Sequence, residues 1–214
     1  MTGKFVTIEG CEGVGKSTQV RKLKEYLSSR GIEAVFTREP GGTPVSEQIR
    51  EVILNPENKD MDDVTELLLY VAARRQHTQR FIKPELEKGN IVFCDRFVDS
   101  TTAYQGYARG LGAEKVESLN ALAVGDVKID LTIFLDFPPE KAFDRKGGRD
   151  TGDRLENEKM EFHKRVYEGF CAIAAKEPER VVRLDASGSK DQTHEKIIKT
   201  LIEKGIIPAE NDAQ

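Results

Sequence analysis

A glycine-rich loop directly follows the first apolar run of the chain, and it constrains the fold more than any other stretch. The run FVTI (5–8) leads into GCEGVGKST (10–18), which satisfies the pattern GxxxxGK[ST]. Glycines let successive backbone N–H groups turn inward around an anion, and the N-terminus of a following helix adds its dipole. In this pattern the lysine contacts the β- and γ-phosphates and the hydroxyl binds Mg²⁺. The sequence therefore predicts a nucleoside-triphosphate site between a strand and a helix.

The predicted triphosphate site takes in the whole loop. Lys16 would supply the point charge, and Ser17 would serve as a metal ligand. A carboxylate, Glu12, also lies in this loop, although the loop is suited to polyanions. The residues assigned to ATP are Gly10, Cys11, Glu12, Gly13, Val14, Gly15, Lys16, Ser17 and Thr18.

Strand-like and helix-like segments alternate along the chain, which is typical of an α/β fold with a parallel sheet. The expected strands are residues 4–9, 33–38, 90–96, 130–136 and 180–186. The expected helices are residues 17–27, 45–54, 64–87 (with a kink near Pro84), 100–124, 139–146, 157–176 and 190–204. These segments predict a five-stranded parallel sheet flanked by helices.

Length and composition favour a single domain in a reducing compartment. The 214 residues suit one domain, expected over 1–208, with a frayed tail at 209–214. The formal net charge of −4 provides no basic field for nucleic acid, and no apolar run approaches the ~18 residues of a membrane span. The three cysteines are widely spaced and form no CxxC pair, which favours free thiols. We therefore expect a cytoplasmic protein without nucleic-acid or membrane partners.

The loop alone does not distinguish a switch, a motor and a kinase. A GTPase should carry an Asn/Thr-Lys-x-Asp element after a late strand, and the sequence has none. A motor ATPase usually has a strand that ends in adjacent acids, whereas the third expected strand ends in Cys94-Asp95-Arg96. An aspartate beside an arginine suits a site that holds a metal and a second anionic substrate together. This pattern favours a small phosphotransferase.

Further arginines follow the expected strands. Arg38 ends the second strand, Arg50 lies in the next helix, and Arg96 ends the third strand. Ligands bind where the carboxyl ends of neighbouring parallel strands converge, and converging guanidinium groups favour a bound phosphate. Tyr70 and Arg74 are four residues apart on one helix face, where a ring and a planar fork could stack on a base and bind its edge.

Together these motifs resemble bacterial thymidylate kinase (dTMP kinase). The resemblance is carried by GxEGxGK[ST]T after the first strand, TREPGGT (37–43), YVAARRQH (70–77), DRFVDSTTAYQGYARG (95–110) and LTIFLD (131–136), in this order. It runs from Phe5 to beyond Tyr167 and so covers most of the chain. It implies a three-layer P-loop NTPase fold with a short lid, transfer of the γ-phosphoryl group of ATP to dTMP with Mg²⁺, and a homodimer.

The resemblance also implies a role for each matching residue. Lys16, Ser17 and the loop amides would hold the ATP phosphates and Mg²⁺, and Asp95 would support the metal. Arg96 would bind the dTMP phosphate with help from Arg38 and Arg50. Tyr70 would stack on thymine, where many relatives have phenylalanine, and Arg74 would bind a thymine carbonyl. Thr101 and Gln105 would read the base edge near N3, and Tyr104 would lie under the sugar and disfavour a 2′-hydroxyl.

The family places a catalytic arginine either in the glycine loop or in the lid. This loop contains no arginine, so the lid, expected at about 145–155, must supply it. Arg149 is the expected catalytic arginine, and Arg154 is the alternative. Glu12 would then point toward the acceptor, where it could accept a hydrogen bond from the deoxyribose 3′-hydroxyl or bind Mg²⁺ through water. We expect Lys16, Asp95, Arg96 and Arg149 to carry the catalysis.

Two alternatives stay open at this point. One is another nucleoside or nucleoside-monophosphate kinase with the same core, and the other is a nucleotide-dependent switch that barely turns over. The helices at 64–87 and 100–124 are candidates for the dimer interface, but core burial explains their apolar faces equally well.

Overall fold

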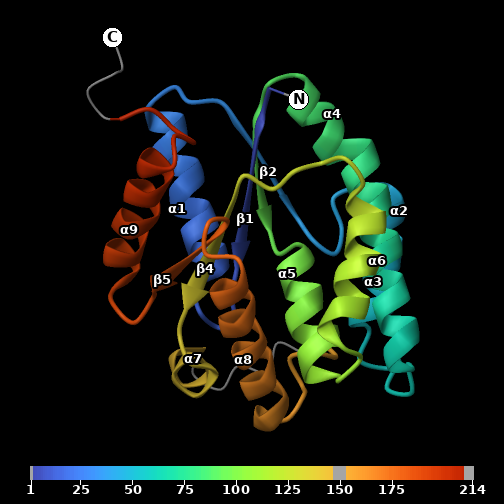
Figure 1. The fold of residues 1–214 in the computed structure, drawn as a ribbon. Helices are drawn as coiled ribbons and strands as arrows, with labels where there is room; N and C mark the ends of the chain where they lie inside the picture. The colour runs from blue at the N-terminus through green and yellow to red at the C-terminus, as the bar shows by residue number, and fades with distance from the viewer. Residues whose placement is uncertain (1, 147–152, 210–214) are drawn as a thin grey trace.

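The chain forms a five-stranded parallel sheet with helices packed around it. The computed structural model describes residues 2–146 and 153–209. The strand order is β2-β3-β1-β4-β5, which confirms the predicted sheet (Figure 1). The strands are β1 (Lys4–Glu9), β2 (Ala34–Arg38), β3 (Ile91–Asp95), β4 (Leu131–Asp136) and β5 (Val181–Asp185).

The helices agree with the expected segments except in two places. The structure contains α1 (Lys16–Ser29), α2 (Pro44–Leu54), α3 (Asp63–His77), α4 (Lys83–Glu87), α5 (Val98–Thr101), α6 (Ala113–Val124), α7 (Pro139–Lys146), α8 (Met160–Lys176) and α9 (Lys190–Glu203). Two π-helical segments, η1 (Thr78–Ile82) and η2 (Thr102–Ala108), continue α3 and α5.

The expected helix at 100–124 is wrong as one element. The helix that starts at α5 ends with η2, and α6 begins afresh at Ala113. Gly110 and Gly112 separate them with φ angles of 75° and 93°, a conformation that breaks a right-handed helix. The expected kink near Pro84 takes the form of the π-helical η1, which precedes a short helix with proline in its first turn.

Both faces of the sheet are buried, as its sequence pattern requires. The first five residues of β4, Leu131–Leu135, are all buried, and successive side chains of a strand point to opposite faces. On one face Phe134 stacks on Phe170 of α8, with the ring centroids 5.2 Å apart. Helices α1 and α9 pack side by side (Figure 1), and their leucines and isoleucines join the same core. This double covering explains the near-continuous apolar runs in the strands.

A buried ion pair fixes α5 and η2 against the sheet. Arg180, just before β5, donates from both terminal nitrogens to the two carboxylate oxygens of Asp99 at 2.8 Å. Thr132 of β4 donates to the same carboxylate at 3.1 Å. Because Asp99 lies in α5, this pair sets the position of η2, which carries Tyr104 and Gln105.

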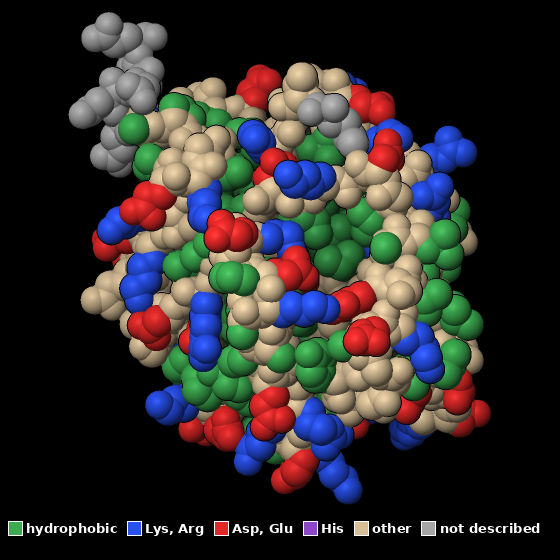
Figure 2. All heavy atoms as spheres, in the orientation of Figure 1, with side chains coloured by type: hydrophobic (Ala, Val, Ile, Leu, Met, Phe, Trp, Pro, Cys, Tyr) green, Lys and Arg blue, Asp and Glu red, His purple; other side chains and the backbone are tan. Residues whose placement is uncertain are grey.

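The surface shows neither a membrane span nor a basic patch on the face in view. Within residues 2–146 and 153–209, no helix has the length and apolar character that crossing a bilayer requires. Figure 2 shows blue and red side chains interspersed over this face. The three cysteines are free thiols, as expected. Of the expected tail, Ala209 accepts a hydrogen bond from Arg30 at 3.0 Å, and residues 210–214 lie outside the described part of the chain.

Candidate active site

A cavity lies where β1, β2 and β3 end, and it collects the residues that the sequence assigned to the acceptor. Arg38 is the last residue of β2, and the loops that follow β1 and β3 carry Glu12 and Arg96. Helix α2 supplies Arg50, and α3 supplies Tyr70 and Arg74. Helix α5 supplies Thr101, and η2 supplies Tyr104 and Gln105. The predicted residues that line the cavity are Glu12, Ser17, Arg38, Arg50, Tyr70, Arg74, Asp95, Arg96, Thr101, Tyr104 and Gln105.

The glycine loop has the backbone that its sequence predicts. Gly10, Gly13 and Gly15 have φ angles of 145°, 75° and 99°, which only glycine adopts without strain. A side chain at Gly13 would also come within 2.8 Å of the Ala142 carbonyl oxygen. The loop therefore needs glycine for its own turn and for the close approach of α7.

Lys16 begins α1 and turns back over the loop. Its Nζ donates to the carbonyls of Gly10 at 2.9 Å and Cys11 at 2.8 Å. Burial, and then the charge of Arg96, lower the pKa of Lys16. Burial also raises the pKa of Cys11 to about 12, so this loop thiol stays protonated near neutral pH.

Glu12 lines the cavity and pairs with Arg96. Its Oε1 accepts from the Arg96 guanidinium at 2.5 Å and from the Tyr104 hydroxyl at 3.2 Å. Although burial lowers the pKa of Arg96, the charge of Glu12 raises it well above the ordinary value. Among the described residues, Arg96 is also the one non-glycine residue with a positive φ, 66°, which aims its side chain back across the loop.

Glu9 lies beneath Arg96 and is fully buried. It accepts hydrogen bonds from the Phe97 N–H at 2.7 Å and the Ser100 hydroxyl at 2.5 Å. The Ser100 hydroxyl also accepts from Arg96 at 3.0 Å, so the serine links the carboxyl to the guanidinium. Burial and then the charge of Asp99 raise the pKa of Glu9 to about 7, against opposing hydrogen bonds.

Asp95 and Ser17 provide oxygens that fit a cation. Asp95 Oδ1 is buried and has no hydrogen-bond partner among residues 2–146 and 153–209, and Ser17 lines the same cavity. Within the described residues, no group of three or more His, Cys, Asp or Glu side chains forms a complete metal site. This oxygen pair suits Mg²⁺, which takes one or two protein ligands and completes its shell with phosphates and water.

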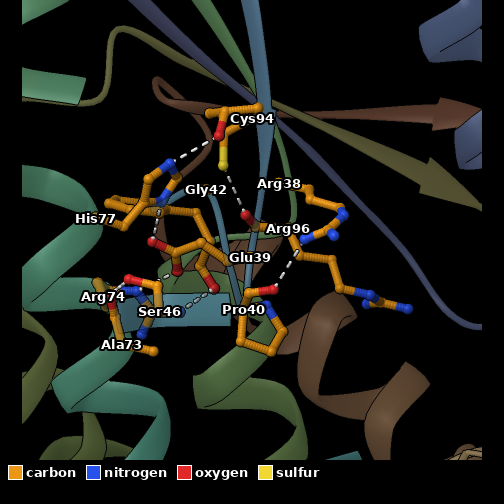
Figure 3. A network of polar contacts seen from close by, with 12 residues as sticks. Arg38, Glu39, Pro40, Gly42, Ser46, Ala73, Arg74, His77, Cys94 and Arg96 are labelled. Carbon is orange, nitrogen blue, oxygen red and sulfur yellow. Dashed lines mark hydrogen bonds and ion pairs between the residues drawn. The ribbon is translucent and has the colours of Figure 1, made fainter. Parts of the chain in front are cut away.

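The buried carboxylate of Glu39 holds two side chains of α3. Figure 3 shows it between Arg74 and His77. Arg74 Nε donates to Glu39 Oε2 at 2.8 Å, and His77 Nδ1 lies 3.0 Å from Oε1. The two terminal nitrogens of Arg74 donate to the Asn120 side-chain oxygen at 2.6 Å and to the Phe97 carbonyl at 2.9 Å. Arg74 is therefore buried and held in one orientation at the cavity wall.

Pro40, the residue after Glu39, binds Arg38 and Arg50 through its backbone carbonyl. The Pro40 carbonyl accepts from Arg50 at 2.8 Å. It also accepts from Arg38 at 3.3 Å (Figure 3). Arg38 also forms a two-point ion pair with Glu47 of α2, at 3.0 and 3.1 Å. Burial and then the charge of Arg38 lower the pKa of Arg50, as expected for crowded positive charges. An anion between these groups would relieve the crowding.

The lid arginines lie in different surroundings. Arg145 donates to the carbonyls of Ala186 and Ser187 before α9. Arg154, the alternative catalytic residue, donates to the Ile53 carbonyl at 3.0 Å and to Glu66 of α3. Arg149 lies outside the described residues.

Sequence reasoning missed the buried carboxylates that hold the predicted arginines and Gln105. These residues are Glu9, Glu39 and Glu66. Two of them left a usable signal: Glu39 lies inside the TREPGGT motif, and Glu66 precedes Tyr70 by one turn of the same helix. Nothing in the sequence indicated that Glu9 is buried, because a carboxylate at the end of an apolar strand is expected to face solvent.

Comparison with known proteins places these features in one family. The family profile described as thymidylate kinase matches residues 8–197. A thymidylate kinase from Bacillus velezensis is 49% identical over 193 residues, covering 89% of this chain and 91% of that protein. One from Symbiobacterium thermophilum is 47% identical over 200 residues, with 94% and 92% covered. The crystal structure of thymidylate kinase from Ehrlichia chaffeensis superposes with a TM-score of 0.78 at 37% identity, covering 94% of this chain and all of that one.

The raised pKa of Glu9 predicts a pH-dependent stability that Glu9→Gln removes. The folded protein holds this proton up to a pKa of about 7, whereas the unfolded chain releases it near 4.5. The contribution of protonated Glu9 to the free energy of unfolding is therefore complete below about pH 4.5, and it is lost as the pH rises through about 7. Between about pH 5 and 8, we expect the free energy of unfolding of the wild type to fall by about 2–3 kcal/mol relative to the variant.

Urea unfolding at several pH values measures this difference. Glu25→Gln, which breaks an exposed pair with Arg21, is the control and should show no such trend. A constant difference between the wild type and Glu9→Gln across the range would show that Glu9 titrates normally.

Proposed function

The chain belongs to the thymidylate kinase family and is an ATP-dependent dTMP kinase, and from this premise we propose how its residues divide the two substrates and Mg²⁺. One observation carries the proposal. Arg38, Arg50 and Arg96 come from three separate elements and meet at the cavity that Ser17 and Asp95 also line. That arrangement suits two phosphate groups side by side with a cation.

The donor side of the site is the glycine loop. The loop amides, Gly10 to Thr18, and Lys16 would hold the ATP phosphates, after Lys16 exchanges its loop carbonyls for phosphate oxygens. Ser17 and Asp95 would hold Mg²⁺, which supplies positive charge that neutralises the phosphates. The unpartnered oxygen of Asp95 supports this assignment.

The acceptor side holds dTMP from its phosphate to its base. Arg96, Arg38 and Arg50 would bind the phosphate, and Glu12 and Tyr104 would face the sugar. Tyr70 would stack on thymine, Arg74 would bind a thymine carbonyl, and Thr101 and Gln105 would read the edge at N3. All these side chains line the cavity. Glu12 is already bonded to Arg96 and Tyr104, which favours its sugar-facing role over a water-mediated metal contact.

The transfer needs positioning and charge more than proton removal. The attacking phosphate oxygen of dTMP is already anionic and forms the new P–O bond, while the bond between the γ-phosphorus and the bridging oxygen breaks and leaves ADP. The side chains therefore align the two nucleotides and neutralise the transferring group, and no strong general base is required.

A purified-protein assay tests the acceptor and the metal together. We expect ATP-dependent phosphorylation to be fastest with dTMP in a panel that also contains dUMP, CMP, UMP, AMP and thymidine. Thymidine should be inert because it offers no phosphate to the arginines. EDTA should abolish turnover, and added Mg²⁺ should restore it. Faster turnover with another monophosphate, or full activity in EDTA, would contradict the assignment.

We propose Arg149 as the arginine that completes charge neutralisation, with residues 145–155 acting as the lid. The described lid arginines support this choice, because Arg145 holds backbone carbonyls and Arg154 is paired with Glu66. An arginine that already neutralises a buried carboxylate, as Arg154 does, has less charge to offer to the transferring phosphoryl group.

Arg149→Ala should lower kcat by a factor of ~10²–10³, with a smaller change in the KM for dTMP, because it removes charge stabilisation from the transition state. Steady-state kinetics with both substrates measures the effect. Arg145→Ala is the matched control and should change kcat by less than ~10-fold. An unchanged kcat in Arg149→Ala together with a large loss in Arg154→Ala would transfer the role to Arg154.

We also propose a homodimer, and a cytoplasmic location in keeping with three free thiols. The helices α2, α3 and α6 pack side by side and expose apolar side chains. These are Val45, Val52, Val64, Leu68 and Leu122, which are between 45% and 72% exposed. A second copy of the same face would cover them.

Leu68→Glu should shift the protein from dimer to monomer, because it places a charge in the centre of this apolar face. Sedimentation velocity over a range of concentrations measures the change. Lys199→Glu, on the exposed face of α9, is the control and should leave the dimer intact. A wild type that sediments as a monomer would refute the homodimer.

A further inference from the structure

The buried carboxylate of Glu66 lies in the first turn of α3 and accepts hydrogen bonds from four donor groups. Its Oε1 accepts from Gln105 Nε2 at 2.8 Å and from Arg109 Nε at 3.3 Å. Its Oε2 accepts from Arg109 at 3.1 Å and from Arg154. The side chain is fully buried, so these contacts replace its hydration. One carboxylate thus connects a residue assigned to base recognition with two arginines.

The two arginines keep this carboxylate charged. Burial alone would raise the pKa of Glu66, but hydrogen bonds from Arg109 and Gln105, and the charges of Arg109 and Arg154, lower it below the ordinary value. Near neutral pH Glu66 is therefore ionised. An ionised carboxylate can only accept hydrogen bonds.

This acceptor fixes which way the Gln105 amide lies. Only the amide nitrogen of Gln105 can bond to Glu66, because its oxygen would face another acceptor. The oxygen must then point elsewhere, and Gln105 lines the cavity beside Tyr70 and Arg74. No donor in the described part of the chain is hydrogen-bonded to this oxygen. The oxygen of the Gln105 amide can therefore accept a hydrogen bond from a molecule in the cavity.

The pyrimidine bases differ at the atom that such an acceptor reads. Thymine and uracil carry a hydrogen on N3, which is a donor, whereas N3 of cytosine is an acceptor. An amide oxygen that cannot rotate away accepts a hydrogen bond from the N3–H group of thymine or uracil. The same oxygen repels N3 of cytosine, because both atoms are acceptors. Reversing the Gln105 amide would present a donor suited to cytosine, but would also turn its oxygen against the Glu66 charge.

We propose that Glu66 is a positioning residue that fixes the orientation of the Gln105 amide and so makes the enzyme select bases with an N3–H group over cytosine. The inference rests on the proposed placement of the base beside Gln105. Glu66 does not touch the substrate and acts through Gln105 alone.

Glu66→Gln tests the proposal by replacing the charge with a neutral amide of the same shape. That amide can face Gln105 with either its oxygen or its nitrogen, so the orientation of Gln105 is no longer fixed. We expect the ratio of kcat/KM for dTMP to kcat/KM for dCMP to fall at least ~10-fold. A merely structural role would lower both values alike, and an unchanged ratio in the folded variant would overturn the proposal.

Glu158→Gln is the matched control. Glu158 accepts from the same arginine, Arg109, at 2.6 Å, but is not bonded to Gln105. The variant therefore loses an ion pair in the same cluster and keeps the orienting bond. Its dTMP-to-dCMP ratio should equal that of the wild type. A fall as large as that of Glu66→Gln would assign the effect to the arginines and overturn the proposal.

The double substitution Glu66→Gln with Gln105→Glu is a rescue that also retains the charge of the cluster. The carboxylate at position 105 would accept from the new amide with one oxygen and from N3–H with the other. We expect its dTMP-to-dCMP ratio to recover at least ~10-fold over Glu66→Gln, or to match the wild type if that variant does not fold. A low ratio in the folded double variant would contradict the orientation mechanism.

Gln105→Ala distinguishes a failure of the role of Glu66 from a failure of the proposed placement of the base beside Gln105. If the base lies beside Gln105, removing the amide should lower the dTMP-to-dCMP ratio at least ~10-fold. A lower ratio in Gln105→Ala with a wild-type ratio in Glu66→Gln would refute the role of Glu66 alone. An unchanged ratio in Gln105→Ala would refute the placement of the base itself.

Discussion

The site depends on acceptor groups, mainly carboxylates, that hold arginines at the cavity wall. Glu12 holds Arg96, Glu39 holds Arg74, and the Pro40 carbonyl next to Glu39 collects Arg38 and Arg50. Without partners, several guanidinium groups facing one cavity would repel one another and carry a large desolvation cost. With them, the fork of Arg74 is held in a fixed direction before a substrate arrives. The fold can therefore present fixed positive groups to a ligand with little reorganisation.

This arrangement gives the carboxylate in the glycine loop a physical reason. A loop suited to polyanions gains nothing from negative charge near its inward amides, but Glu12 lines the cavity and bonds to Arg96 and Tyr104. Beneath them, Glu9 and Ser100 support the same arginine from the core. The glycine loop and the cavity are thus joined through Arg96, which bonds to Gly10 and Glu12 of the loop and has a positive φ.

The sequence predicted most of the fold and the wall of the cavity because both leave local patterns. Apolar runs marked all five strands, and strand-end positions marked Arg38, Asp95 and Arg96. Local patterns failed where the backbone departs from a regular period. Gly110 and Gly112 divide the helix expected at 100–124, and its first part is π-helical. The supporting carboxylates were missed because their partners lie far away in sequence: 39 residues separate Glu66 from Gln105.

The sequence by itself determined the strand–loop–helix that holds a triphosphate, since glycine positions, a lysine and a hydroxyl suffice for that geometry. Its motifs also determined the family. Only the tertiary structure decided which acidic side chain pairs with which arginine, because ion pairing depends on burial and on distances between separate elements. It placed Glu12 with Arg96, Arg154 with Glu66, and the Gln105 amide against a charge that sets its direction. A planar amide has two orientations in any sequence, and a buried neighbour selects one.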